Sequence, residues 1–280
     1  KPGVKEYGLE VEKKWNRVYG RTPTHTFSLG FYNQPKYDIS RIGHLGFNEG
    51  KVAVGYINWD LKVGLFDIDI NGASSIGLLS DWDFTRLYST WNFSKTKTIF
   101  TFNQRGILGK IWTDNKILPG QEGFNIEGNS SNDMLRKNYL VDQFYGQDSL
   151  FSHYHYPGEG NIRGFVGQGE QGAEALIAFS NELIFSNPDI YNISADFALF
   201  SDVGTFFSRN SFQNIFELPQ YKGGYITRIY ADAGLGLRLS TSFFEKDLHI
   251  RFDMPFLLYD DRLGSRLNKS NWIFSFQRSF

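Results

Sequence analysis

The sequence predicts an all-β fold: a transmembrane antiparallel β-barrel of about 12 to 14 strands, with residues 1–280 forming a single barrel domain. Three observations predict it. Aromatic residues are abundant, with 27 Phe, 15 Tyr and 6 Trp. Apolar and polar residues alternate with a period of two through the last part of the chain. A long segment, residues 114–165, lacks such a pattern. Aromatic enrichment with scattered glycines favours strands and tight turns over helices.

The alternation is strongest in residues 174–280. Five segments of roughly ten residues each follow one another there, which is the length that crosses a bilayer at a tilt. In the fourth, every even position from Leu248 to Leu258 is apolar and is expected on one face. The segments are residues 175–185, 193–207, 230–240, 248–258 and 272–280.

The polar face of these segments carries charges of both signs. A soluble sandwich also alternates, with its polar face in water, so the pattern alone is compatible with both folds. Strand length and the terminal aromatic residue favour the membrane barrel, in which these charges line the lumen. The charged and titratable residues are Asp196, Asp202, Asp232, Arg238, His249, Arg251 and Asp253.

The first half gives a more general strand pattern. Residues 52–59 and 61–70 are expected to be strands, and Asn71-Gly72 is a dipeptide typical of a type I′ hairpin turn. At roughly ten to twelve residues per strand plus turns, about seven to nine strands fit before residue 114, and sixteen in total is a poorer fit. Segment 114–165 is therefore interpreted as one large loop, and such loops are usually functional or disordered.

Composition argues against several functions. The net charge is −1, which gives no basic footprint for nucleic acid, and there is no cysteine for a disulfide or thiolate site. No P-loop, HExxH or dinucleotide motif is present. His153 and His155 lack a nearby third metal ligand. We expect no enzymatic activity, no cofactor and no metal site.

Four motifs follow one another in the second half. Arg163-Gly164-Phe165 lies near the end of the long loop, and a Phe-x-Asp-x-Gly motif follows at Phe200, Asp202 and Gly204. A Gly-x-Gly motif at Gly234 and Gly236 and the terminal Phe280 complete the series. In this order and spacing, residues 160–280 resemble the C-terminal part of the BamA-type outer-membrane barrel superfamily. That superfamily includes BamA and TamA assembly factors, FhaC-type two-partner-secretion transporters and the bacterial surface antigen family.

The resemblance implies that the long loop folds into the lumen and that Arg163 pairs with Asp202. A guanidinium inside a barrel is costly unless it is bonded, and its planar fork suits a carboxylate. Glu182 and Asp232 are further inward-facing candidates on neighbouring strands. Phe165 could wedge against the wall. The plain alternative is a surface loop with a solvated arginine.

The C-terminal aromatic residues Trp272, Phe274, Phe276 and Phe280 resemble the signal by which outer-membrane proteins are recognised for assembly. Recognition would proceed by β-augmentation, in which an edge strand pairs with the insertion machinery. The alternative is an ordinary last strand with lipid-facing aromatics. Implied partners are the outer-membrane bilayer of a Gram-negative bacterium with its lipopolysaccharide, the assembly machinery, and client or partner proteins.

Three functions remain open from the sequence. The barrel could assist insertion or translocation of proteins through a weak seam between its first and last strands. It could instead anchor a fused periplasmic enzyme domain or serve as a subunit of a larger complex. Lys1-Pro2-Gly3, with no signal peptide, is what an excised C-terminal domain would show, and this favours the anchor. The third possibility is a soluble β-barrel binding protein.

Overall fold

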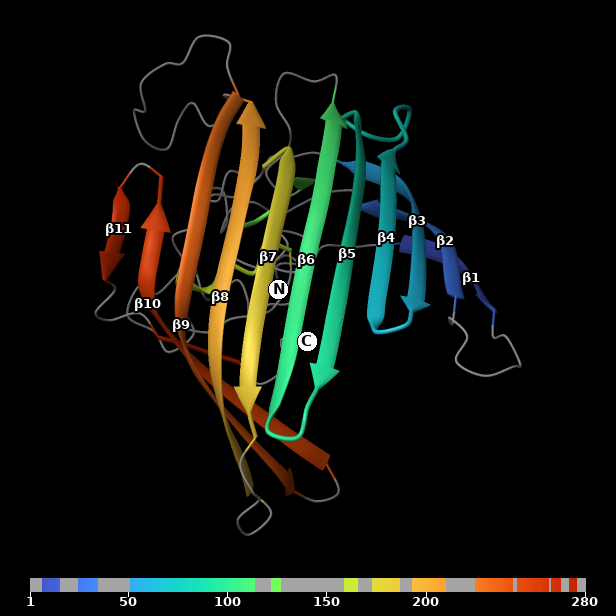
Figure 1. Cartoon of the computed structure of the whole chain (residues 1–280). Coiled ribbons are helices and arrows are strands. Elements are labelled where there is room, and N and C mark those ends of the chain that lie inside the picture. The colour runs from blue at the N-terminus through green and yellow to red at the C-terminus, as the bar shows by residue number, and fades with distance from the viewer. Residues whose placement is uncertain are drawn as a thin grey trace.

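The chain forms one antiparallel sheet in which each strand from β1 to β11 is hydrogen-bonded to the next strand in the sequence (Figure 1). The structure, a computed structural model, describes residues 7–15, 25–34, 51–113, 122–126, 159–165, 173–186, 193–209, 225–243, 246–261, 263–267 and 272–275. The predicted all-β antiparallel fold class is confirmed. In these ranges no α-helix has the length and apolarity to span a bilayer.

Twelve strands and one short helical turn make up the described chain. Strand order in the sheet runs from β1 to β11, and β12 also pairs with β10. The bounds are β1 Tyr7–Trp15, β2 His25–Gln34, β3 Val52–Val63, β4 Phe66–Ser75, β5 Phe84–Thr96, β6 Phe100–Thr113, the 3₁₀ turn η5 Arg163–Phe165, β7 Ala175–Phe185, β8 Ile193–Arg209, β9 Tyr225–Phe243, β10 Lys246–Asp260, β11 Gly264–Leu267 and β12 Ile273–Ser275.

The two edges of the sheet differ in length. At one edge lies β1, which has 9 residues. At the other, β11 pairs with residues 257–260 of β10, and β12 pairs with residues 251–253 of the same strand. The described residues at this edge therefore form two short strands. Among the described residues no pairing joins β1 to β11 or β12, so the described sheet is open between them.

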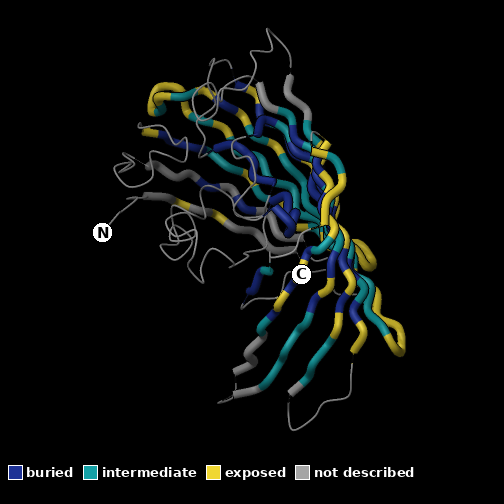
Figure 2. The backbone as a smooth tube through the Cα atoms, turned by 90° about the vertical axis from the view of Figure 1, so that its left-hand side faces the viewer, coloured by how far each residue is buried: buried dark blue, intermediate teal, exposed yellow. Residues whose placement is uncertain are grey.

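The sheet is strongly curved, and buried and exposed residues alternate along its strands (Figure 2). In β8, for example, Phe200, Asp202 and Phe206 are buried, whereas Phe197 is 59% exposed and Leu199 47%. The exposed positions of β7 to β10 are mostly apolar and the buried ones include many charged residues. In a soluble protein the exposed positions of a strand are mostly polar. Apolar exposed positions with charged residues inside are typical of a barrel whose outer face meets lipid.

The predicted hairpin turn at Asn71-Gly72 is wrong. β4 runs straight through these two residues, and Asn71 pairs with Asn58 on β3 and with Tyr88 on β5. The turn comes earlier, between Val63 and Phe66, as a two-residue loop that begins with Gly64 at a φ of 62°. Glycine at the first position of such a loop is favoured because it adopts positive φ without steric cost.

The prediction that all even positions from Leu248 to Leu258 lie on one face is also wrong at the end of this segment. A register shift between Pro255 and Leu257 inserts one extra residue into β10. Bulges of this kind reverse which face the following residues occupy. As a result Leu258 is only 4% exposed and lies in the interior, whereas Leu257 is 47% exposed.

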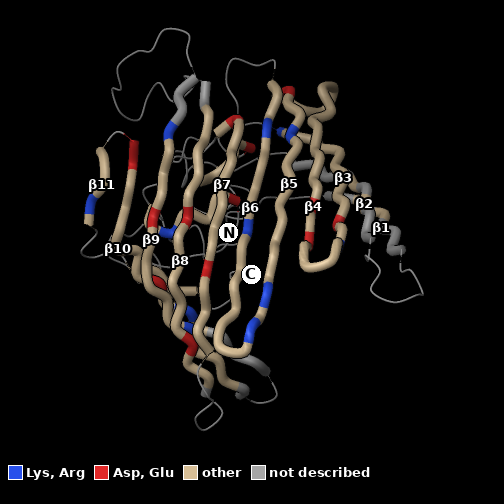
Figure 3. The backbone as a smooth tube through the Cα atoms, viewed as in Figure 1, with Lys and Arg blue, Asp and Glu red and all other residues tan. Residues whose placement is uncertain are grey.

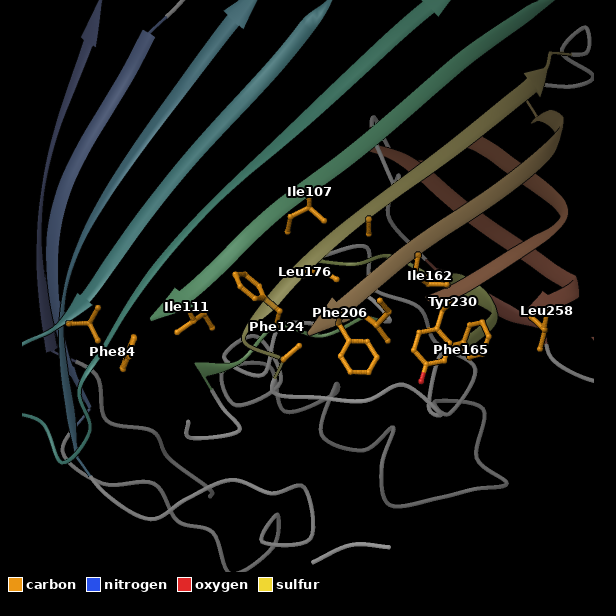
Figure 4. Close-up of a cluster of buried hydrophobic side chains, with 14 of the residues drawn as sticks. Phe84, Ile107, Ile111, Phe124, Ile162, Phe165, Leu176, Phe206, Tyr230 and Leu258 are labelled. Atoms are coloured by element: carbon orange, nitrogen blue, oxygen red, sulfur yellow. The ribbon is translucent and has the colours of Figure 1, made fainter. Parts of the chain in front are cut away.

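An apolar cluster fills one part of the interior beside the loop (Figure 4). Phe124 and Ile162 from the loop lie against Leu176 of β7 and Phe206 of β8, and all four are at most 1% exposed. Burying one such side chain typically stabilises a fold by about 1.5–3 kcal/mol. The described parts of the loop are thus packed onto the inner wall.

Candidate functional site: the ionic network around Arg163

Two stretches of the long loop pair with each other before reaching the wall. Phe124 and Ala173 exchange backbone hydrogen bonds of 2.9 and 3.0 Å. Further along, the Gly160 N–H donates to the Asn125 carbonyl and the Ile162 N–H to the Ile126 carbonyl. Between them Asn161 has a φ of 58°, a left-handed conformation that asparagine tolerates better than most residues. This turn places η5, whose three residues are buried, inside the curved sheet.

Arg163 is bound to Asp202 by a two-pronged contact. Its Nε donates to Asp202 Oδ2 at 2.7 Å and its Nη2 to Oδ1 at 2.8 Å, while its backbone N–H donates to Oδ2 at 3.2 Å. Both side chains are fully buried. Burial disfavours the charge of Arg163, but attraction and hydrogen bonding from Asp202, and then Asp253 and Glu182, raise the pKa of its guanidinium well above the ordinary value.

The remaining groups around Arg163 form a wider ionic network from β7, β9 and β10. Arg163 Nη1 lies 3.5 Å from Glu182 Oε1 and 3.5 Å from Asp253 Oδ2. Glu182 also accepts hydrogen bonds from Arg238 and Arg251, and Arg251 Nε donates to Asp253 at 2.6 Å. Figure 3 shows charged residues on neighbouring strands of this part of the sheet.

The other motif residues make room for this network. The Arg163 guanidinium lies over the ring of Phe200, with Cζ 3.8 Å from the centroid, a cation–π contact. A Cβ at Gly234 would meet that ring and the Met254 carbonyl, and a Cβ at Gly236 would come 2.6 Å from Asp253 Oδ1. The Gly-x-Gly motif therefore leaves the space that Phe200 and Asp253 occupy.

Gly164 and Phe165 have partners of their own. The Gly164 N–H donates to Asp232 Oδ2. The Phe165 ring meets Tyr230 edge-on at 4.6 Å between centroids. Gly204 lies beneath the loop, where an added Cβ would come 3.2 Å from the Ile162 side chain. The structure thus brings together Arg163, Gly164, Phe165, Glu182, Phe200, Asp202, Gly204, Asp232, Gly234 and Gly236.

A second anchor holds the loop about Glu159, and the sequence reasoning missed it. Glu159 Oε2 accepts the Asn125 N–H at 2.6 Å, and its carbonyl accepts a hydrogen bond from Arg105 Nη1 at 2.7 Å. Arg86 Nη1 lies 4.0 Å from Glu159 Oε1. Arg86 and Arg105 occupy inward-facing positions of β5 and β6, so the alternation of residues in these two strands is the sequence signal that points to them.

The C-terminal aromatic residues are only partly described. Trp272 and Phe274 lie 6.0 Å apart between ring centroids, and Phe274 pairs across the strand with Phe252 of β10. Phe274 is 5% exposed. Phe276, Phe280, His153 and His155 lie outside the described residues. Within the described ranges, no group of three or more His, Cys, Asp or Glu side chains is arranged to hold a metal ion.

Comparison with known proteins supports the fold. The chain is similar to the crystal structure of BamA from Haemophilus ducreyi lacking POTRA domains 1–3, with a TM-score of 0.52 and 15% sequence identity. The match covers 96% of this chain and 53% of that one, so the chain spans about half the length of the structure it matches. No family model and no curated protein matches the sequence. The chain therefore shares the β-barrel fold of that BamA structure.

Proposed function

We propose that this chain is an integral outer-membrane barrel that assists the insertion or translocation of other proteins. Support comes from the BamA-type fold, from the apolar outer face of β7 to β10, and from a loop bound to the inner wall by the network around Arg163. A barrel held rigid from within can keep its shape while its edges exchange partners.

The observation that carries the proposal is the pair of unequal sheet edges. In the described part of the chain, β1 presents nine residues at one edge, and the other edge consists of the short strands β11 and β12. Exposed edges offer rows of N–H and C=O groups that can pair with another strand. A client strand would add to β1 by β-augmentation, with main-chain hydrogen bonds giving affinity that is independent of client sequence. Insertion would then proceed one hairpin at a time.

The test uses the purified chain in lipid vesicles and a urea-unfolded outer-membrane barrel as client. The folded client is measured by its heat-modifiable band, which migrates differently in unheated and boiled samples on a gel. Because the chain has no cysteine, single substitutions give clean cross-linking sites. Leu9→Cys on β1 should cross-link to a single-cysteine client, whereas Leu235→Cys, 51% exposed in the middle of the sheet, should not. Client folding at the rate of empty vesicles, with no cross-link at Leu9, would contradict the proposal.

A second function is an anchor for a periplasmic enzyme domain or a partner subunit. The buried network favours an anchor, because the fully buried side chains of Arg163, Glu182 and Asp202 fix the loop inside the barrel. An anchor predicts resistance to alkaline carbonate extraction with client folding unchanged. Release of the chain by carbonate without detergent would contradict both membrane functions.

A further inference from the structure

The buried network holds more acid groups than basic groups. Arg163, Arg238 and Arg251 are its three cations, and its four acids are Glu182, Asp202, Asp232 and Asp253. The four acids are between 1% and 5% exposed. An unpaired carboxylate is very costly in such a place, and the usual outcome is that the group takes up a proton.

The arginines are not shared equally among the four acids. Asp202 receives both prongs of Arg163, Glu182 receives all three arginines, and Asp253 receives Arg163 and Arg251. Asp232 accepts only the Gly164 N–H through Oδ2, and among the described residues its Oδ1 is buried without a hydrogen-bond partner. Asp232 is thus the acid with the least compensation.

Asp232 also faces another acid directly. Asp202 and Asp232 are cross-strand partners on β8 and β9, and both side chains are buried on the inner side of the sheet. Two ionised carboxylates have only acceptor oxygens and repel each other, so a hydrogen bond between them needs one proton. Since Asp202 is neutralised by Arg163, the proton belongs on Asp232.

We propose that Asp232 is a proton-binding site that latches the loop tip: it is a neutral carboxylic acid at neutral pH that donates from Oδ1 to Asp202 while Oδ2 accepts the Gly164 N–H. Loss of this proton leaves four carboxylates against three guanidiniums and adds repulsion at Asp202. The tip of the loop, residues 163–165, is then held less firmly.

The groups that face Asp232 decide the direction of the effect. From η5 comes Arg163, from β8 Asp202 and from β10 Leu258, its cross-strand partner. Arg238 and Glu182 belong to the same network beyond them. An aspartate exposed by undocking ionises near pH 4, so the docked state binds one proton more above that pH. Docking stability therefore decreases as pH rises, until the docked state loses the proton too.

Infrared difference spectroscopy of the whole chain in detergent micelles gives a direct test. Wild type should show the C=O stretching band of a protonated carboxylic acid at pH 7.5, and this band should fade on titration to alkaline pH. Asp232→Asn should abolish the band. The amide replaces the acid with matching geometry, since its nitrogen donates to Asp202 and its oxygen accepts from Gly164, so the variant is expected to fold.

Asp253→Asn is the matched control, because Asp253 is equally buried but paired with arginines. The carboxylic-acid band should persist in this variant. A second measurement is the melting temperature from pH 6 to pH 9: it should fall in wild type and stay nearly constant in Asp232→Asn. Absence of the band in wild type at pH 7.5, or its persistence in Asp232→Asn, would overturn the proposal.

Discussion

Replacing Arg163 by alanine is the most informative single perturbation of this barrel. The change removes the two short contacts to Asp202, at 2.7 and 2.8 Å, and the cation–π contact to Phe200. It leaves the network with two guanidiniums against the same acids, all nearly inaccessible to water. Removing one partner of a buried ion pair typically costs about 3–5 kcal/mol, because the other charge stays buried and uncompensated.

Such a cost lowers the equilibrium constant for folding by at least about a hundredfold, because each factor of ten corresponds to about 1.4 kcal/mol. We expect the heat-modifiability midpoint of Arg163→Ala to fall well below that of wild type and the loop to become cleavable by protease. Arg163→Lys should be intermediate, since lysine keeps the charge but loses the planar fork.

Lys62→Ala serves as the matched control. Lys62 Nζ also makes an ion pair, 3.1 Å from Asp67, but these side chains are 61% and 54% exposed. Exposed pairs contribute at most about 1 kcal/mol, so this variant should behave like wild type. If Arg163→Ala has the same midpoint and protease resistance as Lys62→Ala, the buried network does not hold the loop.

Four further predictions address other parts of the barrel. Asp202→Asn should lower the heat-modifiability midpoint nearly as much as Arg163→Ala, because an amide cannot neutralise the guanidinium; a midpoint equal to wild type would contradict the pairing. Gly234→Ala should cost about 1–3 kcal/mol by overpacking against Phe200 and the Met254 carbonyl, measured by chemical unfolding, and an unchanged midpoint would argue against that close approach. Glu159→Gln should expose the loop to protease with a smaller loss of barrel stability, and equal losses would mean that the two anchors are not separate. Deleting Phe280 should reduce the amount of chain in the outer membrane by cell fractionation, and unchanged levels would count against an assembly signal.

The sequence predicts the second half of the molecule better than the first. Alternation indicates correctly which face of β7, β8 and β9 is inside, because the side-chain period of a strand is two. It fails at Leu258, since a bulge reverses parity without leaving a mark in the local pattern. At Asn71-Gly72 the dipeptide is typical of a turn, but pairing with the strands on both sides outweighs that local preference.

The alternation of apolar and polar residues does not predict contacts between segments that are distant in the sequence. The pairing of Arg163 with Asp202 could be expected only through the resemblance to a known superfamily, which placed these two residues together. Glu159 and Arg105 belong to no such motif, and they are separated by a stretch without periodic pattern. The convergence of Arg163, Arg238 and Arg251 on Glu182 likewise depends on strand register and on where the loop docks, which the sequence pattern does not state.

The long loop also affects how the barrel folds. β6 and β7 pair as neighbours although residues 114–174 lie between them, whereas β3 and β4 pair across only two residues. The entropic cost of closing a loop rises by about 0.6 kcal/mol for each doubling of its length. Five doublings therefore add about 3 kcal/mol to the cost of pairing β6 with β7. The buried ion pair of Arg163 is of similar magnitude, and the contacts of Glu159 add to it. These contacts offset the entropic cost once the two strands have paired. Pairing of β6 with β7 and docking of the loop are therefore expected to occur as one cooperative step.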